Sequence, residues 1–358
     1  MSVLKLTSDL AEAASVGGCV LGGGGGGSMK EGICMAKMAT EFASLELWDG
    51  EDLPEDAVLI NVSAVGAPSA ETAFFTPADY GKAVSNLGKF ADIKIAGIIS
   101  NEAGGLATVN GWLQSALLGV PVVDLPSNGR AHPTGVMGAM GLHKVEGYQS
   151  IQSAVGGDPA CGRRVEVVVQ GSIQNASAQV RNAAVLAGGF VGVARNPVTV
   201  GYAKKHAAGG AIKQAIRLGQ GMIAKREQGG PAVMEEICRQ LNGAIVHQGK
   251  VEKVDLVCKG GFDAGAVYWD GFELTFWNEY MTAEKDGVRL GTFPDLMMTL
   301  DAQTGWPVTS AEIRAGMEIA VLHVGREHLH LGAGMWDPDL YRGCEDAVGK
   351  EIIRYVFE

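Results

Sequence analysis

The stretch Val120–Arg130 (VPVVDLPSNGR) decides the expected fold, because an apolar strand stops abruptly here in Asp, Pro, Asn and Gly. Two earlier apolar segments end in the same way, at Ala64–Ser69 (AVGAPS) and at Ser100–Gly105 (SNEAGG). Helical segments between them predict a β-α-β-α-β alternation, which is typical of a parallel sheet. The carboxyl ends of parallel strands share one edge of the sheet, and ligands bind along that edge. We therefore expect the polar residues after these strands to converge on a small-molecule site.

Five polar residues at these strand ends are candidates for the site: Asn101, Glu102, Asp124, Asn128 and Arg130. Glu102 and Asp124 form the candidate acid–base pair, because burial at a strand end raises a carboxyl pKa toward a useful range. Each has a structural alternative, a helix cap for Glu102 and an Asx-turn for Asp124. Arg130 offers a planar fork for a substrate carboxylate, and Asn128 would help to orient the substrate.

Histidines supply the remaining candidates for chemistry. His132 follows Arg130 closely and can move a proton or bind a metal, although a histidine satisfied in the core is the alternative. The segment His323–His330 carries three histidines, and its His-x-His pattern on a strand would place two imidazoles on one face. This would suit a divalent metal such as zinc; the alternative is a solvated strand end. Glu279 breaks an apolar strand and either crosses a domain cleft or lies on an exposed face.

The glycine run Gly22–Gly27 matches the GxGxxG pattern of dinucleotide sites, with a short strand expected at Cys19–Leu21 and a helix at Met29–Thr40. A P-loop is excluded, because Ser28-Met29-Lys30 follows the run instead of Lys-Ser or Lys-Thr. Three interpretations stay open: a nucleotide, another anionic or carbonyl ligand, or a tight turn alone. The backbone N–H groups that could hold a substrate oxyanion belong to Gly23, Gly24, Gly25 and Gly26.

The composition indicates a globular protein of 358 residues, 47% hydrophobic and long enough for two domains. We expect an N-terminal parallel-sheet α/β domain at residues 1–165 and a β-rich α/β domain at residues 166–358. The net charge of −11 argues against a nucleic-acid partner, because phosphates require a basic surface. The start of the chain lacks a secretory pattern, no apolar run is long enough to span a membrane, and the six cysteines are dispersed. These features predict a cytoplasmic protein without a membrane partner.

Short motifs along the whole chain carry a resemblance to a known family: Leu21–Gly27 (LGGGGGG), Gly66-Ala67-Pro68, Asn101–Gly105 (NEAGG), Pro121–Asp124 with Gly129-Arg130-Ala131 and Pro133, Gly249-Lys250-Val251, Gly260-Gly261-Phe262, Phe276–Glu279 (FWNE), Pro294-Asp295-Leu296 and Leu300–Gly305 (LDAQTG). Their order and spacing resemble the bacterial family named for S-methyl-thiohydantoin desulfurase, formerly a domain of unknown function. The resemblance implies two α/β domains, the second similar to swivelling β/β/α domains. It also implies hydrolytic removal of a methylthio group from a thiohydantoin ring, and hydantoinase or oxoprolinase companions.

The chain departs from the family pattern after Asp124. Pro126 stands where the family commonly has a second Asp, and His132 stands where it commonly has Phe. Either the substrate differs, or the catalytic set is built around His132.

These observations lead to one expected function and two alternatives. We expect a hydrolase of a small cyclic substrate, in which water attacks an sp² ring carbon with Asp124, Glu102 or a bound divalent metal as the activating group. His132 would then protonate the leaving group. The alternatives are a non-catalytic ligand-binding or accessory subunit of a hydantoinase or oxoprolinase system, and a nucleotide-binding protein. We also expect the chain to form a homo-oligomer.

Overall fold

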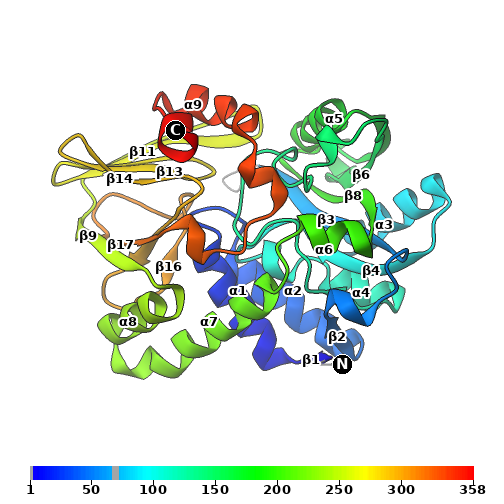
Figure 1. The fold of residues 1–358 in the computed structure, drawn as a ribbon, viewed down its shortest axis with the longest axis horizontal. Helices are drawn as coiled ribbons and strands as arrows, with labels where there is room; N and C mark the ends of the chain where they lie inside the picture. The colour runs from blue at the N-terminus through cyan, green and yellow to red at the C-terminus, as the bar shows by residue number, and fades with distance from the viewer. Residues whose placement is uncertain (1–2, 67–71) are drawn as a thin grey trace.

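An eight-stranded mixed sheet organises the first part of the chain in the computed structural model, which describes residues 3–66 and 72–358 (Figure 1). Four neighbouring strands are parallel: β2 (Leu45–Trp48), β5 (Val122–Val123), β4 (Ile95–Ser100) and β3 (Val58–Gly66). Antiparallel strands flank them: β1 (Leu4–Leu6) on one side, and β8 (Phe190–Thr199), β6 (Ser150–Gly156) and β7 (Val165–Gly171) on the other. The expected parallel sheet and α/β class are confirmed. Ala67, Pro68 and Ser69 of the first predicted strand end lie outside the described residues.

Helices cover both faces of this sheet: α3 (Pro77–Ala91), α4 (Trp112–Leu118), α5 (Ile173–Leu186) and α6 (Val200–His206). The helix α3 begins where Thr76 and Asp79 form a capping box around Pro77. It packs on Val155 of β6, whereas α5 packs on the neighbouring Ala154, whose side chain points to the opposite face. The sheet extends across the boundary predicted near residue 165, because β6 pairs with β7 and β8 beyond it.

Two antiparallel sheets build the rest of the molecule. The first contains β10 (Lys253–Lys259), β11 (Phe262–Trp269), β12 (Phe272–Trp277), β13 (Glu279–Lys285) and β14 (Val288–Thr292). The second contains β16 (Pro307–Val308), β15 (Leu296–Asp301), β17 (Glu318–Val324) and β9 (Ala244–Lys250). The helices of this part are α7 (Ala211–Lys225), α8 (Gly230–Leu241), α9 (Arg342–Val348) and α10 (Ile353–Phe357). The expectation of a β-rich second α/β domain is therefore confirmed.

The helix α1 (Ser8–Leu21) corrects one prediction, since Cys19–Leu21 is its last turn and not a strand. Within this helix, Gly17 packs directly on α7, where a Cβ would overlap the carbonyl oxygen of Ala215. The glycine run therefore connects α1 to α2 (Met29–Phe42). A dinucleotide fingerprint requires a strand ahead of its glycines, and that context is missing here.

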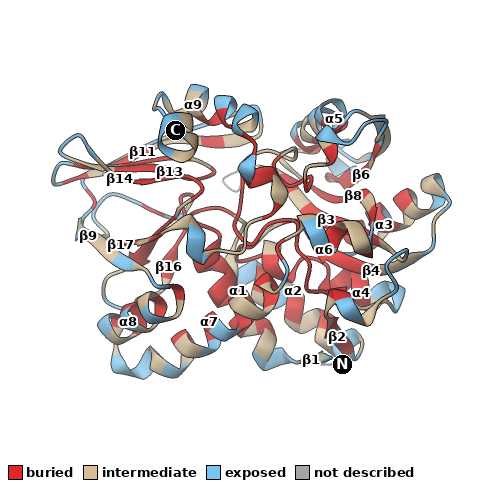
Figure 2. Ribbon diagram, viewed as in Figure 1, coloured by how far each residue is buried: buried red, intermediate tan, exposed pale blue. Residues whose placement is uncertain are grey.

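Many buried residues lie where the two parts of the molecule meet (Figure 2). The buried side of α1 and the loop between β5 and β6 both lie in this region, and the loop residues from Asp124 to Pro133 are all buried. A loop normally lies on the surface, because its backbone polar groups need water or other partners. The burial of this loop places its side chains inside the protein.

We predict that the close contact between α1 and α7 is sensitive to a single methyl group. A Cβ at Gly219 would overlap the backbone of Ala13, so Gly219→Ala should lower the free energy of unfolding by roughly 1–3 kcal/mol. Thermal unfolding followed by circular dichroism measures the effect. The matched control is Gly221→Ala in the same helix, where the added Cβ meets the movable side-chain ends of Gln240 and Glu236. Equal melting temperatures for the two variants would contradict the prediction.

Candidate functional site

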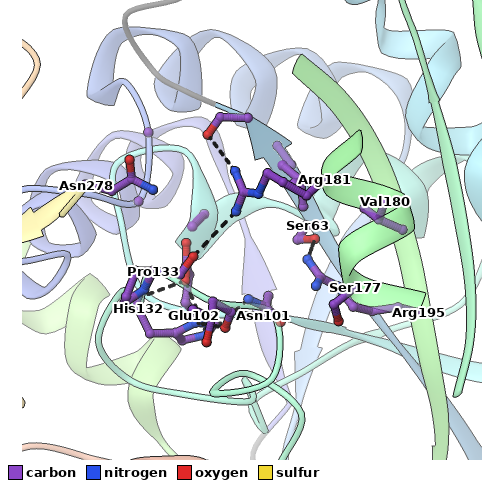
Figure 3. A pocket seen from close by; sticks show the side chains of 18 of the residues that line it. Ser63, Asn101, Glu102, His132, Pro133, Ser177, Val180, Arg181, Arg195 and Asn278 are labelled. Atoms are coloured by element: carbon purple, nitrogen blue, oxygen red, sulfur yellow. Dashed lines mark hydrogen bonds and ion pairs between the residues drawn. The ribbon is translucent and has the colours of Figure 1, made fainter. Parts of the chain in front are cut away.

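A cavity of about 430 Å³ lies between the eight-stranded sheet and the β-rich part of the chain (Figure 3). Its size suits a small organic ligand. Its polar lining comes from both parts of the molecule and includes Ser63, Asn101, Glu102, His132, Ser177, Arg181, Arg195, Asn278 and Glu279. Three of the predicted site residues, Asn101 and Glu102 from a strand end and the candidate His132, therefore meet in one cavity.

A chain of hydrogen bonds holds His132 in a defined state. Asn61 on β3 donates from Nδ2 to Oδ1 of Asn101 over 3.1 Å, and Nδ2 of Asn101 lies 3.1 Å from Nε2 of His132. The carbonyl oxygen of Thr134 lies 3.0 Å from Nδ1 of His132 and can only accept, so Nδ1 carries the proton. Burial lowers the pKa of His132 to about 3, with the charge of Arg195 acting in the same direction. The imidazole is therefore neutral at physiological pH.

Glu102 lies directly against this histidine. Its Oε2 accepts the backbone N–H of His132 over 3.2 Å and lies 3.3 Å from Nε2 of the same residue. Burial raises the pKa of Glu102 to about 7, against the opposing effect of the backbone hydrogen bond from His132 and of the positive charges on Arg195 and Arg181. A carboxyl group with this pKa exchanges its proton readily near neutral pH.

Two arginines, which the sequence analysis did not single out, line the cavity. Arg181 on α5 donates to the carbonyl oxygens of Gly66, Gly261 and Pro133 over 3.3, 2.8 and 3.4 Å. It therefore ties the end of β3 to two loops around the cavity. Arg195 on β8 donates to the hydroxyl of Ser63, and its buried Nε has no partner among the described residues. Burial lowers the pKa of each guanidinium to about 10, which leaves both charged at neutral pH.

Glu279 enters the cavity from the other part of the chain. It is buried at the start of β13, and within residues 3–66 and 72–358 its Oε2 has no hydrogen-bond partner. Burial and the nearby Glu102 raise its pKa well above that of an ordinary carboxyl, and the guanidinium of Arg130 opposes this rise. Glu279 is therefore buried in the wall of the cavity between the two parts of the molecule, and it does not lie on an exposed face.

Asp124, Asn128 and Arg130 lie outside the cavity lining. The Asp124 carboxylate accepts the backbone N–H groups of Ile212 and Lys213 over 2.8 and 3.3 Å, and so caps the start of α7. Burial also raises its pKa to about 6. Asn128 donates to the carbonyl oxygen of Arg130 and accepts a hydrogen bond from the backbone N–H of Gly332.

Arg130 is fully buried in the contact between the two parts of the molecule. It donates from Nη2 to the carbonyl oxygen of Tyr280 over 3.1 Å, and its guanidinium carbon lies 4.4 Å from the ring centre of Phe293. The structure therefore gives Arg130 a role in joining the two parts of the molecule.

The glycine run contributes its end, Gly26 and Gly27, to the cavity lining. The N–H groups of Gly23, Gly24 and Gly25 are already engaged, with the carbonyl oxygen of Val20, the sulfur of Met298 and the carbonyl oxygen of Gly22. A Cβ at Gly25 would overlap the carboxyl group of Glu279. Close packing against the β-rich part accounts for these glycines, and three of the four predicted oxyanion donors are occupied within the protein.

The predicted histidine cluster does not assemble. His323 pairs with Asp295 at 3.4 Å, and His328 pairs with the amide of Asn242 at 2.7 Å. Across residues 3–66 and 72–358, no three His, Cys, Asp or Glu side chains gather in a way that could hold a metal ion. The divalent metal stays a prediction, and no step below depends on it. No helix in the same described ranges is long and apolar enough to cross a membrane.

The sequence did contain a signal for the polar residues that were missed. Asn61 and Ser63 alternate in the otherwise apolar strand β3, which places both side chains on one face. Arg195 interrupts the equally apolar strand β8 and lies opposite Asn61 in the register. A polar or charged residue in a central strand is rarely buried without a partner or a function.

Family models match nearly the whole chain. The S-Me-THD-like N-terminal domain matches residues 9–159, and the S-Me-THD-like C-terminal domain matches residues 172–331. No curated protein matches the chain significantly. An X-ray structure of a protein from Chromobacterium violaceum is 21% identical, with a TM-score of 0.71 over 97% of this chain and 96% of that one, and so shares the fold. Because the two matched domains follow each other in order along the sequence, this chain belongs to the S-Me-THD-like family.

Proposed function

We propose that this protein hydrolyses a small ring of the S-methyl-thiohydantoin type, releasing methanethiol and leaving a hydantoin. The observation that carries the proposal is the position of Glu102, a carboxyl group with a pKa of about 7 in a cavity of about 430 Å³. Membership of a family described as S-Me-THD-like supports this choice of ring. A hydantoin-like ring, whose amide carbon is also sp², is the related substrate class.

In the first step, the ionised Glu102 takes a proton from a water molecule while the water oxygen bonds to the ring carbon that carries sulfur. The π electrons of the ring C=N bond move to nitrogen, where negative charge develops. The guanidinium of Arg195 lies on the same cavity wall and stabilises that charge. Glu102 is then the protonated partner for the second step.

In the second step, the tetrahedral carbon expels the methylthio group. The C–S bond breaks, and Glu102 returns its proton to sulfur, which leaves as methanethiol. The added hydroxyl loses its proton to the ring nitrogen as the C=O bond of the hydantoin forms. Water and the methylthio ring are therefore converted to hydantoin and methanethiol without an oxidant or reductant.

His132 and Asn101 act as positioning residues in this scheme. The neutral His132 holds no proton on Nε2, so it cannot protonate a leaving group, and it orients Glu102 through its backbone N–H, which donates to Oε2. Asn101 keeps the imidazole in this orientation through its amide. The protonation role that the sequence analysis gave to His132 passes to Glu102 in the proposal.

We expect the purified protein to release methanethiol from S-methyl-thiohydantoins, as measured by thiol analysis of the headspace together with chromatography of the hydantoin. Glu102→Gln should lower kcat at least 100-fold, because general acid–base catalysis by one group contributes about that much or more. The matched control is Glu227→Gln, since this side chain is 89% exposed. Wild-type activity in Glu102→Gln would contradict the assigned role, and no methanethiol from well-folded wild-type protein would contradict the function.

The pKa of Glu102 also predicts the pH dependence. The reaction requires the ionised carboxylate, and burial raises its pKa to about 7. The value of kcat/KM should therefore rise about tenfold per pH unit below pH 7 and level off above it. Initial rates from pH 5 to pH 9, corrected for the uncatalysed reaction, provide the measurement. A plateau that already begins near pH 5 would show that an ordinary carboxyl group controls the rate.

A further inference from the structure

We propose that Glu279 is a second catalytic residue of the ring hydrolysis, which donates a proton to the ring nitrogen and then accepts one from the added hydroxyl group. This inference rests on the proposed function and completes its proton route. In the second step, the added hydroxyl loses its proton to the ring nitrogen. Both atoms are bonded to the same carbon, so a direct transfer would need a sharply bent hydrogen bond, which is weak. A carboxyl group that contacts both atoms avoids this geometry.

Two glutamates of the cavity come from different parts of the molecule. Glu102 follows β4 of the eight-stranded sheet, whereas Glu279 begins β13 of an antiparallel sheet, and both line the same cavity. The cavity lies between these parts, so a bound ring can present its sulfur-bearing carbon to one carboxyl group and the adjacent nitrogen to the other. The two groups are close enough for the charge of Glu102 to act on Glu279.

A tight turn fixes the position of Glu279. The preceding residue, Asn278, has a left-handed backbone with a φ of 57°. Its backbone N–H donates to the carbonyl oxygen of Asp263 over 2.7 Å, and its Oδ1 accepts the backbone N–H of the same residue over 2.9 Å. Such a backbone is uncommon for a residue other than glycine and persists only where its surroundings hold it. The turn therefore keeps Glu279 at a fixed place in the cavity wall.

The Glu279 carboxyl group has space and an unused oxygen atom. Gly25 lies beside it, and a Cβ at that position would overlap Oε1. The other oxygen, Oε2, is buried and has no hydrogen-bond partner in the part of the chain that the structure describes. Burying a polar atom without a partner costs free energy, so each such atom needs an explanation. A proton exchanged with a bound ring would supply the missing hydrogen bond.

The titratable neighbours of Glu279 favour a division of roles between the two glutamates. Burial and the charge of Glu102 raise the pKa of Glu279 well above that of an ordinary carboxyl, and the positive charges of Arg130 and Arg181 oppose this rise. The thiol of Cys344 also interacts with Glu279, and burial raises the thiol pKa, so it stays neutral. One ionised carboxylate opposes ionisation of the second, so the pair keeps one proton. The cavity then contains a base and an acid at the same pH.

The proton transfers balance over the two steps. While Glu102 takes a proton from water, the ring nitrogen takes the proton of Glu279, which becomes a carboxylate. When the C–S bond breaks and Glu102 returns its proton to sulfur, Glu279 takes the proton of the added hydroxyl as the C=O bond forms. Both glutamates regain their starting states, and the ring and water become hydantoin and methanethiol.

The kinetics of methanethiol release in two variants test the role of Glu279. Glu279→Gln keeps the size of a neutral side chain but cannot pass on a proton, so kcat should fall at least 100-fold while KM changes less than threefold. The matched control is Glu318→Gln in the β-rich part, where the side chain is exposed. Glu279→Ala should lose as much activity, and added formate should restore at least a tenfold increase, because its carboxyl group exchanges protons. Formamide, a neutral molecule of similar size, should restore none.

Each outcome bears on a different claim. Wild-type kcat in Glu279→Gln, or a loss that comes from KM alone, would overturn the proton transfer by Glu279 and leave ring hydrolysis in place. Equal rescue of Glu279→Ala by formate and formamide would overturn it too, because filling the space would then be sufficient. If thermal unfolding shows that Glu279→Ala does not fold, Glu279→Gln decides alone. No methanethiol from wild-type protein would contradict the proposed function itself, and the inference with it.

Discussion

Burial of charged groups between the two parts of the molecule is the constraint on which the site depends. Arg130, Arg195, Glu102 and Glu279 all lie in this contact, where water is largely excluded. Removing water disfavours the charged form of a group, so both carboxyl pKa values rise. A guanidinium starts from so high a pKa that it stays charged after the same change. The contact therefore combines proton-exchanging acids with permanent cations.

Close backbone packing makes that contact possible. The helix α1 approaches α7 at Gly17, where a side chain would overlap the backbone of Ala215. In the glycine run, a side chain at Gly25 would overlap the carboxyl group of Glu279. The same packing occupies the N–H groups of three run glycines inside the protein. The run thus places the β-rich part against the sheet, and its last two glycines form part of the cavity wall.

The polar residues at the carboxyl edge of the sheet could be predicted, because an apolar strand followed by polar residues is a pattern within a few neighbouring residues. Asn101 and Glu102 directly follow the apolar strand β4, so their position at the carboxyl edge comes from strand order alone. Asp124 follows β5 by the same rule and still lies elsewhere, because the start of α7 offers it two backbone N–H groups. A partner 88 residues away along the chain leaves no mark near Asp124 itself.

The sequence by itself determined the α/β class, the parallel strands, the β-rich second part and the candidates at the strand ends, because hydrophobic periodicity and strand-end chemistry act over a few residues. Only the tertiary structure decided which candidates share a cavity, that Glu279 and Arg195 join them, and which groups change their pKa. The physical reason is that burial and charge interactions depend on distance in space. Arg195 acts on Glu102 from another strand of the same sheet, and nothing in the local sequence of either residue specifies that approach.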